Sequence, residues 1–316
     1  MYQTCNSIDD ALRNAYSILS QQSDVFTASR GDFRELRGAT IRLNNPRLRL
    51  SRTERRGRPF SALAELVWYL SGSNRIEPIQ AYIPGYDENA EADGTVHGAY
   101  GPRLRDWRGR DQLRETINFL KTEPGSRRAV IQLFDSDDGK GSHKDIPCTT
   151  TLQLLQRAGR LDLIATMRSN DVWLGLPHDV FCFTMIQEIA ARTLGVGIGE
   201  YVHFAGSLHL YEKDRDAATA FLGEGFQDEV EMPHMPDGDP WPSIDELIDL
   251  ERELRVEPST ARRHSQPYWS DLGILLQAQL TRDPTQLRAL RDELEWPSGR
   301  IYIDELANMR ERQSRL

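Results

Sequence analysis

The chain has 316 residues, 39% of them hydrophobic, and a formal net charge of −9 at neutral pH. Its length suits one large domain or two ordinary ones, and its acidity argues against a nucleic-acid coat protein, whose phosphate contacts need a basic surface. It has neither an apolar run long enough to span a membrane nor a secretory signal at its N-terminus, so we expect a cytoplasmic protein.

Hydrophobic periodicity predicts the elements of the first half of the chain. Apolar residues at helical spacing predict a helix over Ser7–Leu19, with Ser7 as its N-cap. Alternation predicts a strand or hairpin over Gly38–Ser51, and a strongly apolar helix over Phe60–Leu70 ends at Ser71 and Gly72. The other expected elements are a polar loop region at Tyr82–Gly98, an amphipathic helix at Asp111–Lys121 and a buried strand at Arg128–Phe134.

The second half is predicted to contain a hairpin, a long helix, a strand and a helical end. The expected elements are strands Thr149–Leu155 and Arg160–Met167, helix His178–Leu194, strand Tyr201–Tyr211, an irregular loop at Asp228–Trp241, and helices Ile244–Leu254, Tyr268–Leu280 and Pro284–Glu295, the last capped by Asp283. No linker forces a boundary. We therefore predict a single α+β domain over residues 1–316, with a core at roughly 30–214 and a divergent, mostly helical part at 215–316.

Two polar side chains interrupt apolar patterns and are candidates for catalysis. Glu65 lies within the apolar helix, where burial raises the pKa of a carboxyl and suits a general acid/base; the alternative is a structural carboxylate bonded to backbone. Cys148 could be a small buried hydrophobe, whereas a nucleophilic role needs a nearby cation, such as Arg168. The other cysteines, Cys5 and Cys182, are far away, which argues against a disulfide framework.

The positive charge is nearly all arginine, since only four of the 39 basic residues are lysine. Codon usage is one explanation, and binding of a small anionic ligand is another, because guanidinium groups bind phosphate in a bidentate manner. Arg127 and Arg128 are adjacent in a predicted strand and would point to opposite faces. One of them would then need an anion, unless both form surface salt bridges.

Five motifs, in order and at similar spacing, resemble those of the thymidylate synthase family. They are the helix segment Glu65–Trp68, the arginine pair of Ser126–Arg128, the nucleophile motif Pro147–Cys148, the segment Arg168–Pro177 that matches RS-x-D-x-x-L-G-x-P, and the H-x-Y motif His209–Tyr211. The pair Tyr100–Gly101 matches a further position of the family. The resemblance covers roughly Arg30 to Tyr211, about three-fifths of the chain.

The resemblance implies a homodimer built on a large mixed β-sheet packed with helices, with a helical C-terminal addition. It implies a pyrimidine nucleoside monophosphate as substrate, and no direct contact with nucleic acid. The residues implied to bind the nucleotide are Arg127 and Arg128 at the phosphate from across the dimer interface, Arg168, Ser169 and Arg30 at the phosphate within the subunit, and His209 and Tyr211 at the sugar.

The resemblance also implies covalent catalysis. The thiolate of Cys148 would add to C6 of the pyrimidine, which makes C5 nucleophilic toward the one-carbon unit of 5,10-methylenetetrahydrofolate. Glu65 would move protons at the base through water, and Tyr100 belongs to the same catalytic set. Asp171 and Gly175 would contact the folate co-substrate, and no metal is implied.

Position 179 departs from thymidylate synthases, which carry asparagine there. An amide can donate to uracil O4 and accept from N3–H, whereas cytosine presents the opposite pattern. Asp179 can accept from the cytosine amino group and meet N3 through one shared proton, so it predicts a cytosine base. The cytidylate and deoxycytidylate hydroxymethylases of the family have this substitution. The alternative is that Asp179 is a helix N-cap.

Three further departures favour a hydroxymethyl product over a methyl product, because methyl formation requires that water be kept from the intermediate. The C-terminal segment Arg310–Leu316 is polar, Tyr86 and Asn89 stand where we align tryptophans, and Thr149 replaces the histidine that usually follows the nucleophile. Ser169 is typical of deoxynucleotide-using relatives and favours deoxycytidylate over cytidylate.

Our hypothesis is therefore a 5-hydroxymethyltransferase that acts on dCMP or CMP with 5,10-methylenetetrahydrofolate. One alternative is a thymidylate synthase that methylates dUMP. Another is a nucleotide-binding protein that has lost catalysis, and a third is a cysteine hydrolase in which His178 is the nearest candidate base for Cys148.

Overall fold

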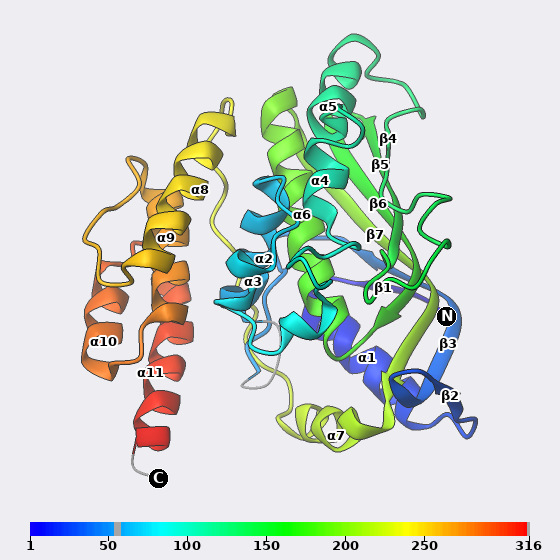
Figure 1. Ribbon diagram of the computed structural model, residues 1–316, viewed down its shortest axis with the longest axis horizontal. Coiled ribbons are helices and arrows are strands. Elements are labelled where there is room, and N and C mark those ends of the chain that lie inside the picture. The colour runs from blue at the N-terminus through cyan, green and yellow to red at the C-terminus, as the bar shows by residue number, and fades with distance from the viewer. Residues whose placement is uncertain (54–57, 315–316) are drawn as a thin grey trace.

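A seven-stranded mixed sheet forms the centre of the molecule in the computed structural model, which describes residues 1–53 and 58–314 (Figure 1). Its strand order is β1-β3-β7-β6-β5-β4, and β2 pairs with β3 at one side. The pairs β1–β3 and β6–β7 are parallel and the others are antiparallel. The strands are β1 (Tyr2–Cys5), β2 (Phe26–Ala28), β3 (Gly31–Leu43), β4 (Val130–Gln132), β5 (Thr149–Arg157), β6 (Arg160–Asp171) and β7 (Gly197–Tyr211). This arrangement confirms the predicted α+β class.

Helices cover one face of the sheet and continue outward in layers (Figure 1). The long helix α6 packs on β6 and β7, α2 packs on α6, and the C-terminal helices α8 and α9 pack on α2. The described helices are α1 (Ile8–Ser20), α2 (Pro59–Leu70), α3 (Ile76–Gln80), α4 (Tyr100–Arg105), α5 (Gln112–Thr122), α6 (Gly175–Leu194), α7 (Arg215–Gly223), α8 (Trp241–Val256), α9 (Pro267–Leu280), α10 (Pro284–Glu293) and α11 (Arg300–Ser314), with a short 3₁₀ helix η1 (Tyr86–Asn89). One continuous apolar cluster joins these layers. The single domain over residues 1–316, with its core at roughly 30–214, stays a prediction.

Local chemistry explains why several elements begin and end where predicted. Ser7 caps α1 by accepting a hydrogen bond from the Asp10 amide in a capping box. Gly195 ends α6 in a left-handed conformation, with φ of 66°. Ala158 and Gly159, with φ of 48° and 73°, form the two-residue turn between β5 and β6, as the right-handed twist of a tight hairpin requires.

Other boundaries differ from the prediction. The strand expected at Gly38–Ser51 is β3, which begins at Gly31 and ends at Leu43. It is followed by a turn at Pro46 and Arg47, closed by a hydrogen bond from the Leu48 amide to the Asn45 carbonyl, and Pro46 cannot donate a ladder bond. Regular pairing of the strand expected at Arg128–Phe134 is limited to Val130–Gln132. Helix α6 begins three residues before the expected His178, and the periodicity missed the elements β1, β2, α3, α4, α7 and α11.

The second face of the sheet carries partly exposed apolar side chains. Along β6 and β7 the side chains alternate, so that Leu163 and Ala205 are buried while Ile164, Val202 and Phe204 are only half-buried. Ile164 pairs with Val202, and Phe204 lies two residues further along β7. These side chains form one apolar strip on the face opposite α6.

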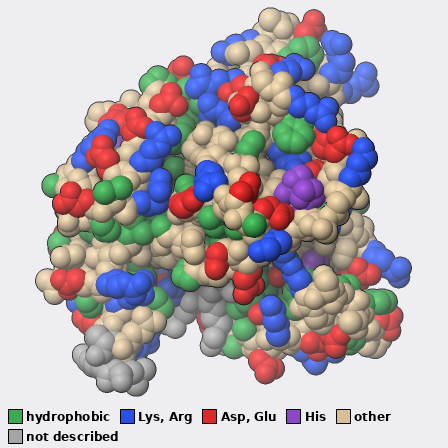
Figure 2. Space-filling model, viewed as in Figure 1, with side chains coloured by type: hydrophobic (Ala, Val, Ile, Leu, Met, Phe, Trp, Pro, Cys, Tyr) green, Lys and Arg blue, Asp and Glu red, His purple; other side chains and the backbone are tan. Residues whose placement is uncertain are grey.

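Two buried arginines form ion pairs inside the protein. Arg49 is fully buried, with Nη2 2.5 Å from Glu188 Oε2, and the other Glu188 oxygen accepts from the Met235 amide at 3.0 Å. Arg103 donates to both oxygens of Asp138, at 2.7 and 2.8 Å. Part of the arginine excess is therefore structural. On the face shown in Figure 2, basic and acidic side chains are interspersed. No helix in the described residues is long and apolar enough to cross a membrane.

Replacing Arg49 with methionine should lower the free energy of unfolding by about 3–5 kcal/mol, because Glu188 would stay buried without its cation. Denaturant unfolding followed by circular dichroism measures this loss. The double variant Arg49→Met/Glu188→Met removes both charges and should be closer in stability to the wild type. Equal losses in the single and double variants would show that the ion pair is not the cause.

Candidate active site

Cys148 immediately precedes β5. Through the β5–β6 pairing it lies at the same end of the sheet as the last residues of β6 and β7, which include other candidates. It is the partly exposed cysteine of the chain, whereas Cys5 and Cys182 are buried. Its carbonyl oxygen accepts a hydrogen bond from the Arg168 amide at 2.8 Å, next to the Thr149–Met167 pair of the β5–β6 ladder. The hairpin therefore fixes the position of the thiol, and it places Arg168 beside it as predicted.

The Arg168 side chain holds the loop that leads to Cys148. Its Nε donates to the Pro147 carbonyl and its Nη2 donates to the Ile146 carbonyl, both at 2.9 Å. The guanidinium group thus lies against the backbone of the nucleophile loop while it keeps its charge near the thiol. This geometry leaves further N–H groups of Arg168 able to bind an anion.

Burial raises the pKa of the Cys148 thiol, and the charges around it act in both directions. Arg168, and more weakly Arg30, lower the pKa of Cys148, whereas Asp179 and Asp145 raise it. A thiolate is the nucleophilic form, so the resting site favours the thiol and the two arginines supply the positive field that opposes burial.

Side chains, and not backbone, hold the Glu65 carboxylate. The Tyr69 hydroxyl donates to Oε1 at 2.7 Å, and Nδ1 of His178 lies 2.7 Å from Oε2. The other ring nitrogen of His178 lies 3.1 Å from the Ser61 hydroxyl. The backbone-bonded alternative for Glu65 is therefore wrong. The hydrogen bonds of His178 in the described residues go to Glu65 and Ser61 and not to Cys148, which argues against His178 as the base of a cysteine hydrolase.

Tyr100 supports the strand that follows the nucleophile. Its hydroxyl accepts from the Thr149 amide at 3.0 Å and lies 2.9 Å from the Thr149 hydroxyl. Thr149 is fully buried, so the residue that replaces the family's histidine is turned inward onto Tyr100. Burial raises the pKa of Tyr100 strongly, and the group stays a neutral phenol.

Asp179 lies inside α6, in its second turn. The N-cap of α6 is Leu174, so the helix-cap alternative for Asp179 is wrong. Its Oδ2 accepts a hydrogen bond from Asn170 Nδ2 at 2.7 Å, and Oδ1 has no hydrogen-bond partner in the described part of the chain. Burial, followed by repulsion from Glu65, raises the pKa of Asp179 well above its ordinary value.

The ends of β6 and β7 bring four predicted residues together. Asp171 pairs with His209 in the parallel register, and the Ser169 hydroxyl lies 3.4 Å from His209 Nδ1. The Tyr211 ring stands edge-on to His209, with centroids 5.0 Å apart. Burial lowers the pKa of His209, and Asp171 partly opposes that shift. These side chains offer hydroxyl and imidazole groups beside Arg168.

Arg30 also reaches this site, from the turn between β2 and β3. Its Nη2 donates to Asn89 Oδ1 at 3.1 Å. The neighbouring Tyr86 packs edge-on against Trp68, with ring centroids 5.7 Å apart, and Glu65 is one of the groups that raise its pKa after burial. The segment that we aligned with family tryptophans therefore borders the site.

Arg127 and Arg128 are not brought to the site within one chain. Both are exposed and precede the edge strand β4. The next residue, Ala129, accepts a hydrogen bond from the Leu154 amide, so the pair lies toward the end of β5 that is remote from Cys148. The strand prediction that gave them opposite faces was wrong, because β4 begins only at Val130.

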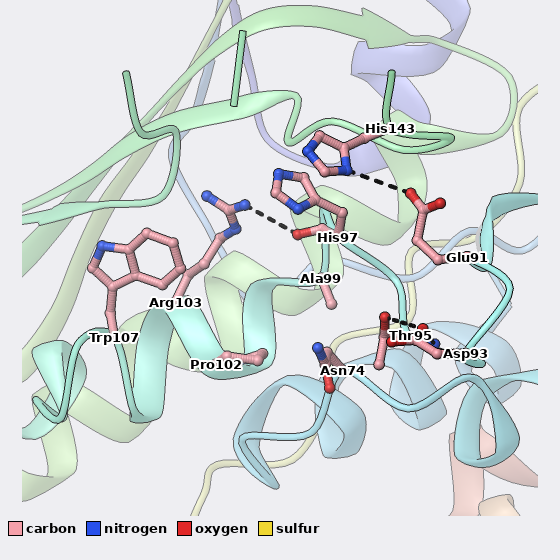
Figure 3. Close-up of a pocket in the computed structure, with 10 residues that line it drawn as sticks. All are labelled: Asn74, Glu91, Asp93, Thr95, His97, Ala99, Pro102, Arg103, Trp107 and His143. Atoms are coloured by element: carbon pink, nitrogen blue, oxygen red, sulfur yellow. Dashed lines mark hydrogen bonds and ion pairs between the residues drawn. The ribbon is translucent and has the colours of Figure 1, made fainter. Parts of the chain in front are cut away.

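A cavity of about 430 Å³ is lined mainly by residues between Glu91 and Trp107, with Asn74 and His143, and by none of the catalytic candidates (Figure 3). The stacked rings of His97 and His143 form part of its wall, with centroids 3.5 Å apart and planes within 3° of parallel. His97 precedes Tyr100, and His143 precedes Cys148, so the stack ties together the two segments that position these residues.

Sequence reasoning missed three polar residues at the site. Asp145 lies close enough to Cys148 to raise its pKa, and no motif pointed to it. Asn170 occupies an unspecified position of the RS-x-D motif, yet it binds Asp179. His178 was considered only as a base for Cys148, whereas it binds Glu65. Among the described residues no group of three or more His, Cys, Asp or Glu side chains could hold a metal ion.

Comparison with known proteins identifies the family of the chain. The family model for thymidylate synthase matches residues 34–236, more than half of the chain. The chain belongs to the thymidylate synthase family. A deoxyuridylate hydroxymethyltransferase of Pseudomonas phage M6 is 35% identical over 164 residues, which cover 51% of this chain and 46% of the phage protein. The protein of the same name from Bacillus phage SP01 is 32% identical over 219 residues, 64% of this chain and 56% of its own length. The chain spans about half the length of the curated relatives it matches.

Alkylation of Cys148 by iodoacetamide should become faster as pH rises, with a midpoint above that of an ordinary cysteine, because burial disfavours the thiolate. Mass spectrometry of the Cys148 peptide measures the rate. In Arg168→Met the midpoint should move to higher pH, since a group that lowers the pKa is lost. Arg168→Lys keeps the charge and should stay near the wild type. A midpoint that Arg168→Met leaves unchanged would contradict the electrostatic role.

Proposed function

We propose that this protein is a pyrimidine nucleotide 5-hydroxymethyltransferase that converts dCMP or CMP to its 5-hydroxymethyl derivative. The observation that carries the proposal is the buried carboxyl of Asp179, which holds one amide donor on Oδ2 and leaves Oδ1 open. Its raised pKa favours a shared proton, and a carboxyl with one proton complements N3 and the 4-amino group of cytosine.

The names of the phage relatives support a hydroxymethyl product but do not support cytosine as the base. Both are named hydroxymethyltransferases, which supports addition of water at the one-carbon unit. Both are also named for deoxyuridylate, so a uracil nucleotide is the competing substrate. The carboxyl at position 179 favours cytosine, and a thymidylate synthase acting on dUMP remains the second candidate function.

The proposed reaction begins with Cys148. Its thiolate adds to C6 of the pyrimidine, with Arg168 and Arg30 opposing the burial that disfavours the thiolate. Electron density then accumulates at C5, the atom that acquires the one-carbon unit. Glu65, held by Tyr69 and His178, is positioned to exchange protons at the base through water. Loss of the C5 proton and departure of tetrahydrofolate then leave a methylene group on C5, and water adds to this carbon to give the hydroxymethyl group. Elimination of the thiolate from C6 restores the C5–C6 double bond and frees the enzyme.

The co-substrate proposed to supply the one-carbon unit is 5,10-methylenetetrahydrofolate. The residues at the start of α6 fit this group. One oxygen of Asp171 accepts from the Trp173 and Leu174 amides, and the other has no partner in the described chain and can face a pterin. Leu174 is 47% exposed and offers an apolar surface beside it, next to Gly175. The partly polar rim at Tyr86 and Asn89 suits a site that admits water.

We propose that the nucleotide phosphate binds Arg168, Ser169 and Arg30, and that the sugar binds His209 and Tyr211. The remaining phosphate ligands would be Arg127 and Arg128 of the partner subunit in a homodimer. The half-buried apolar strip of Ile164, Val202 and Phe204 supports such an assembly, because a second copy packed there would bury it. We also propose that the polar segment Arg310–Leu316 leaves the site less closed to water. Helix α11 ends at Ser314, and Arg315 and Leu316 lie outside the described residues.

A substrate panel of CMP, dCMP, UMP and dUMP with methylenetetrahydrofolate tests the proposal. The expected result is a product heavier by CH₂O, formed from a cytosine nucleotide and measured by mass spectrometry. In Asp179→Asn, uracil nucleotides should gain activity relative to cytosine nucleotides, because an amide complements O4 and N3–H.

Three outcomes would contradict the proposal. A gain of CH₂O on a uracil nucleotide alone would show that the enzyme hydroxymethylates uracil and not cytosine. A gain of CH₂ on dUMP alone would identify a thymidylate synthase. Nucleotide binding without turnover of any member of the panel would identify an inactive binding protein. Cys148→Ala is the matched control, because it should abolish turnover while a nucleotide can still bind.

A further inference from the structure

Four buried polar side chains (Tyr201, His203, Asn170 and Asp179) form a hydrogen-bonded relay that ends on Asp179. The Tyr201 hydroxyl lies 2.8 Å from His203 Nδ1, and His203 Nε2 lies 3.0 Å from Asn170 Oδ1. Asn170 Nδ2 then donates to Asp179 Oδ2 at 2.7 Å. Tyr201 and His203 are at most 1% exposed, and Asn170 is 3% exposed. Polar groups buried this deeply cost free energy unless each bond is made.

One set of hydrogen-bond directions satisfies every member of this relay. Burial lowers the pKa of His203 to about 3, so its imidazole is neutral and carries one N–H. In the described residues the Tyr201 hydroxyl has His203 as its only hydrogen-bond partner, so we infer that it donates to Nδ1 and that the ring proton resides on Nε2. That N–H donates to Asn170 Oδ1, which turns the amide N–H₂ of Asn170 toward Asp179.

This direction matters because a protonated carboxyl is ambiguous. It can present its O–H to N3 and its C=O to the amino group of cytosine, or it can present its C=O to N3–H and its O–H to O4 of uracil. The two arrangements differ only in which oxygen carries the proton. A donor from Asn170 on Oδ2 makes that oxygen an acceptor, so any proton on Asp179 resides on Oδ1. With Oδ1 toward N3 and Oδ2 toward the exocyclic group of the base, as the proposal requires, this arrangement complements cytosine and not uracil.

We propose that Asn170, oriented by His203 and Tyr201, is a specificity-determining residue that fixes the donor and acceptor oxygens of Asp179 and thereby lets the site distinguish cytosine from uracil. The inference rests on the proposed pyrimidine nucleotide substrate. Asn170 acts through Asp179 and is a positioning residue. It removes the ambiguity that an isolated carboxyl would have.

The backbone of α6 leaves room for this contact. A Cβ at Gly175 would lie 2.8 Å from Asn170 Nδ2 and 3.4 Å from Asp179 Oδ2. Any side chain there would push the amide away from the carboxyl. Glycine at this position, assigned to the co-substrate by resemblance, is thus also required for the hydrogen bond between Asn170 and Asp179.

Discrimination is measured as the ratio of kcat/KM for dCMP to kcat/KM for dUMP, and likewise for CMP and UMP. In Asn170→Ala the ratio should change by about tenfold or more toward unity, the effect of losing one hydrogen bond to a charged or proton-sharing group. In Tyr201→Phe, which removes one oxygen atom, the imidazole proton can move to Nδ1 and the amide can reverse, so the ratio should change in the same direction.

Two variants serve as controls. His203→Gln keeps a donor for Asn170 Oδ1 and should retain most of the discrimination. Thr184→Val alters another buried polar residue of α6, whose hydroxyl, within the described part of the chain, bonds only to carbonyls of its own helix. It should leave the ratio unchanged even where it lowers stability.

The inference is overturned if Asn170→Ala and Tyr201→Phe slow both bases equally, because a merely structural role would do that. Should Asn170→Ala not fold, Tyr201→Phe alone decides. A wild-type protein that prefers dUMP would refute the cytosine proposal. The role of the relay would still be judged by whether Asn170→Ala and Tyr201→Phe change the ratio of kcat/KM between the two bases. Should no nucleotide turn over, the same ratio is taken from dissociation constants of CMP and UMP measured by calorimetry.

Discussion

The pairing of β5 with β6 is the constraint on which the rest of the site depends. It places Cys148 opposite Arg168 by a backbone hydrogen bond, and the Arg168 side chain then grips the carbonyls of Pro147 and Ile146. A rigid hairpin therefore presents the nucleophile, although the nucleophile itself lies just outside the strand. The continuation of β6 carries Ser169, and its parallel pairing with β7 adds the sugar-binding candidates.

Helices α2 and α6 each bring one carboxyl group, Glu65 and Asp179, to a largely buried site. Glu65 is held by Tyr69 and His178, and Asp179 is held by Asn170. The two carboxyls repel, which contributes to the raised pKa of Asp179. We propose that Glu65 transfers protons and that Asp179, whose carboxyl favours the protonated form, recognises the base through a shared proton.

The long periodic elements and the motif residues could be predicted from sequence because their patterns are local. Cys148 and Arg168 are 20 residues apart and meet through one hairpin. The relay could not be predicted in this way. His203 and Asn170 lie on different strands and are not register partners, since His203 pairs with Ala165 and Asn170 pairs with Leu208, so strand patterns do not indicate their side-chain contact. Short elements such as β1 and α4 were missed because so few residues show no detectable period. The exposed pair Arg127 and Arg128 lies away from the site within one chain, and its proposed role depends on a partner subunit.

The central claim is that Cys148 attacks C6 of a cytosine nucleotide. Release of tritium from C5 of labelled dCMP or CMP reports this attack most directly, because C5 exchanges its hydrogen only after the thiolate has added. The account predicts release from a cytosine nucleotide by the wild type and none by Cys148→Ala. Release from labelled dUMP alone would contradict the choice of base, and release that persists in Cys148→Ala would contradict the nucleophile.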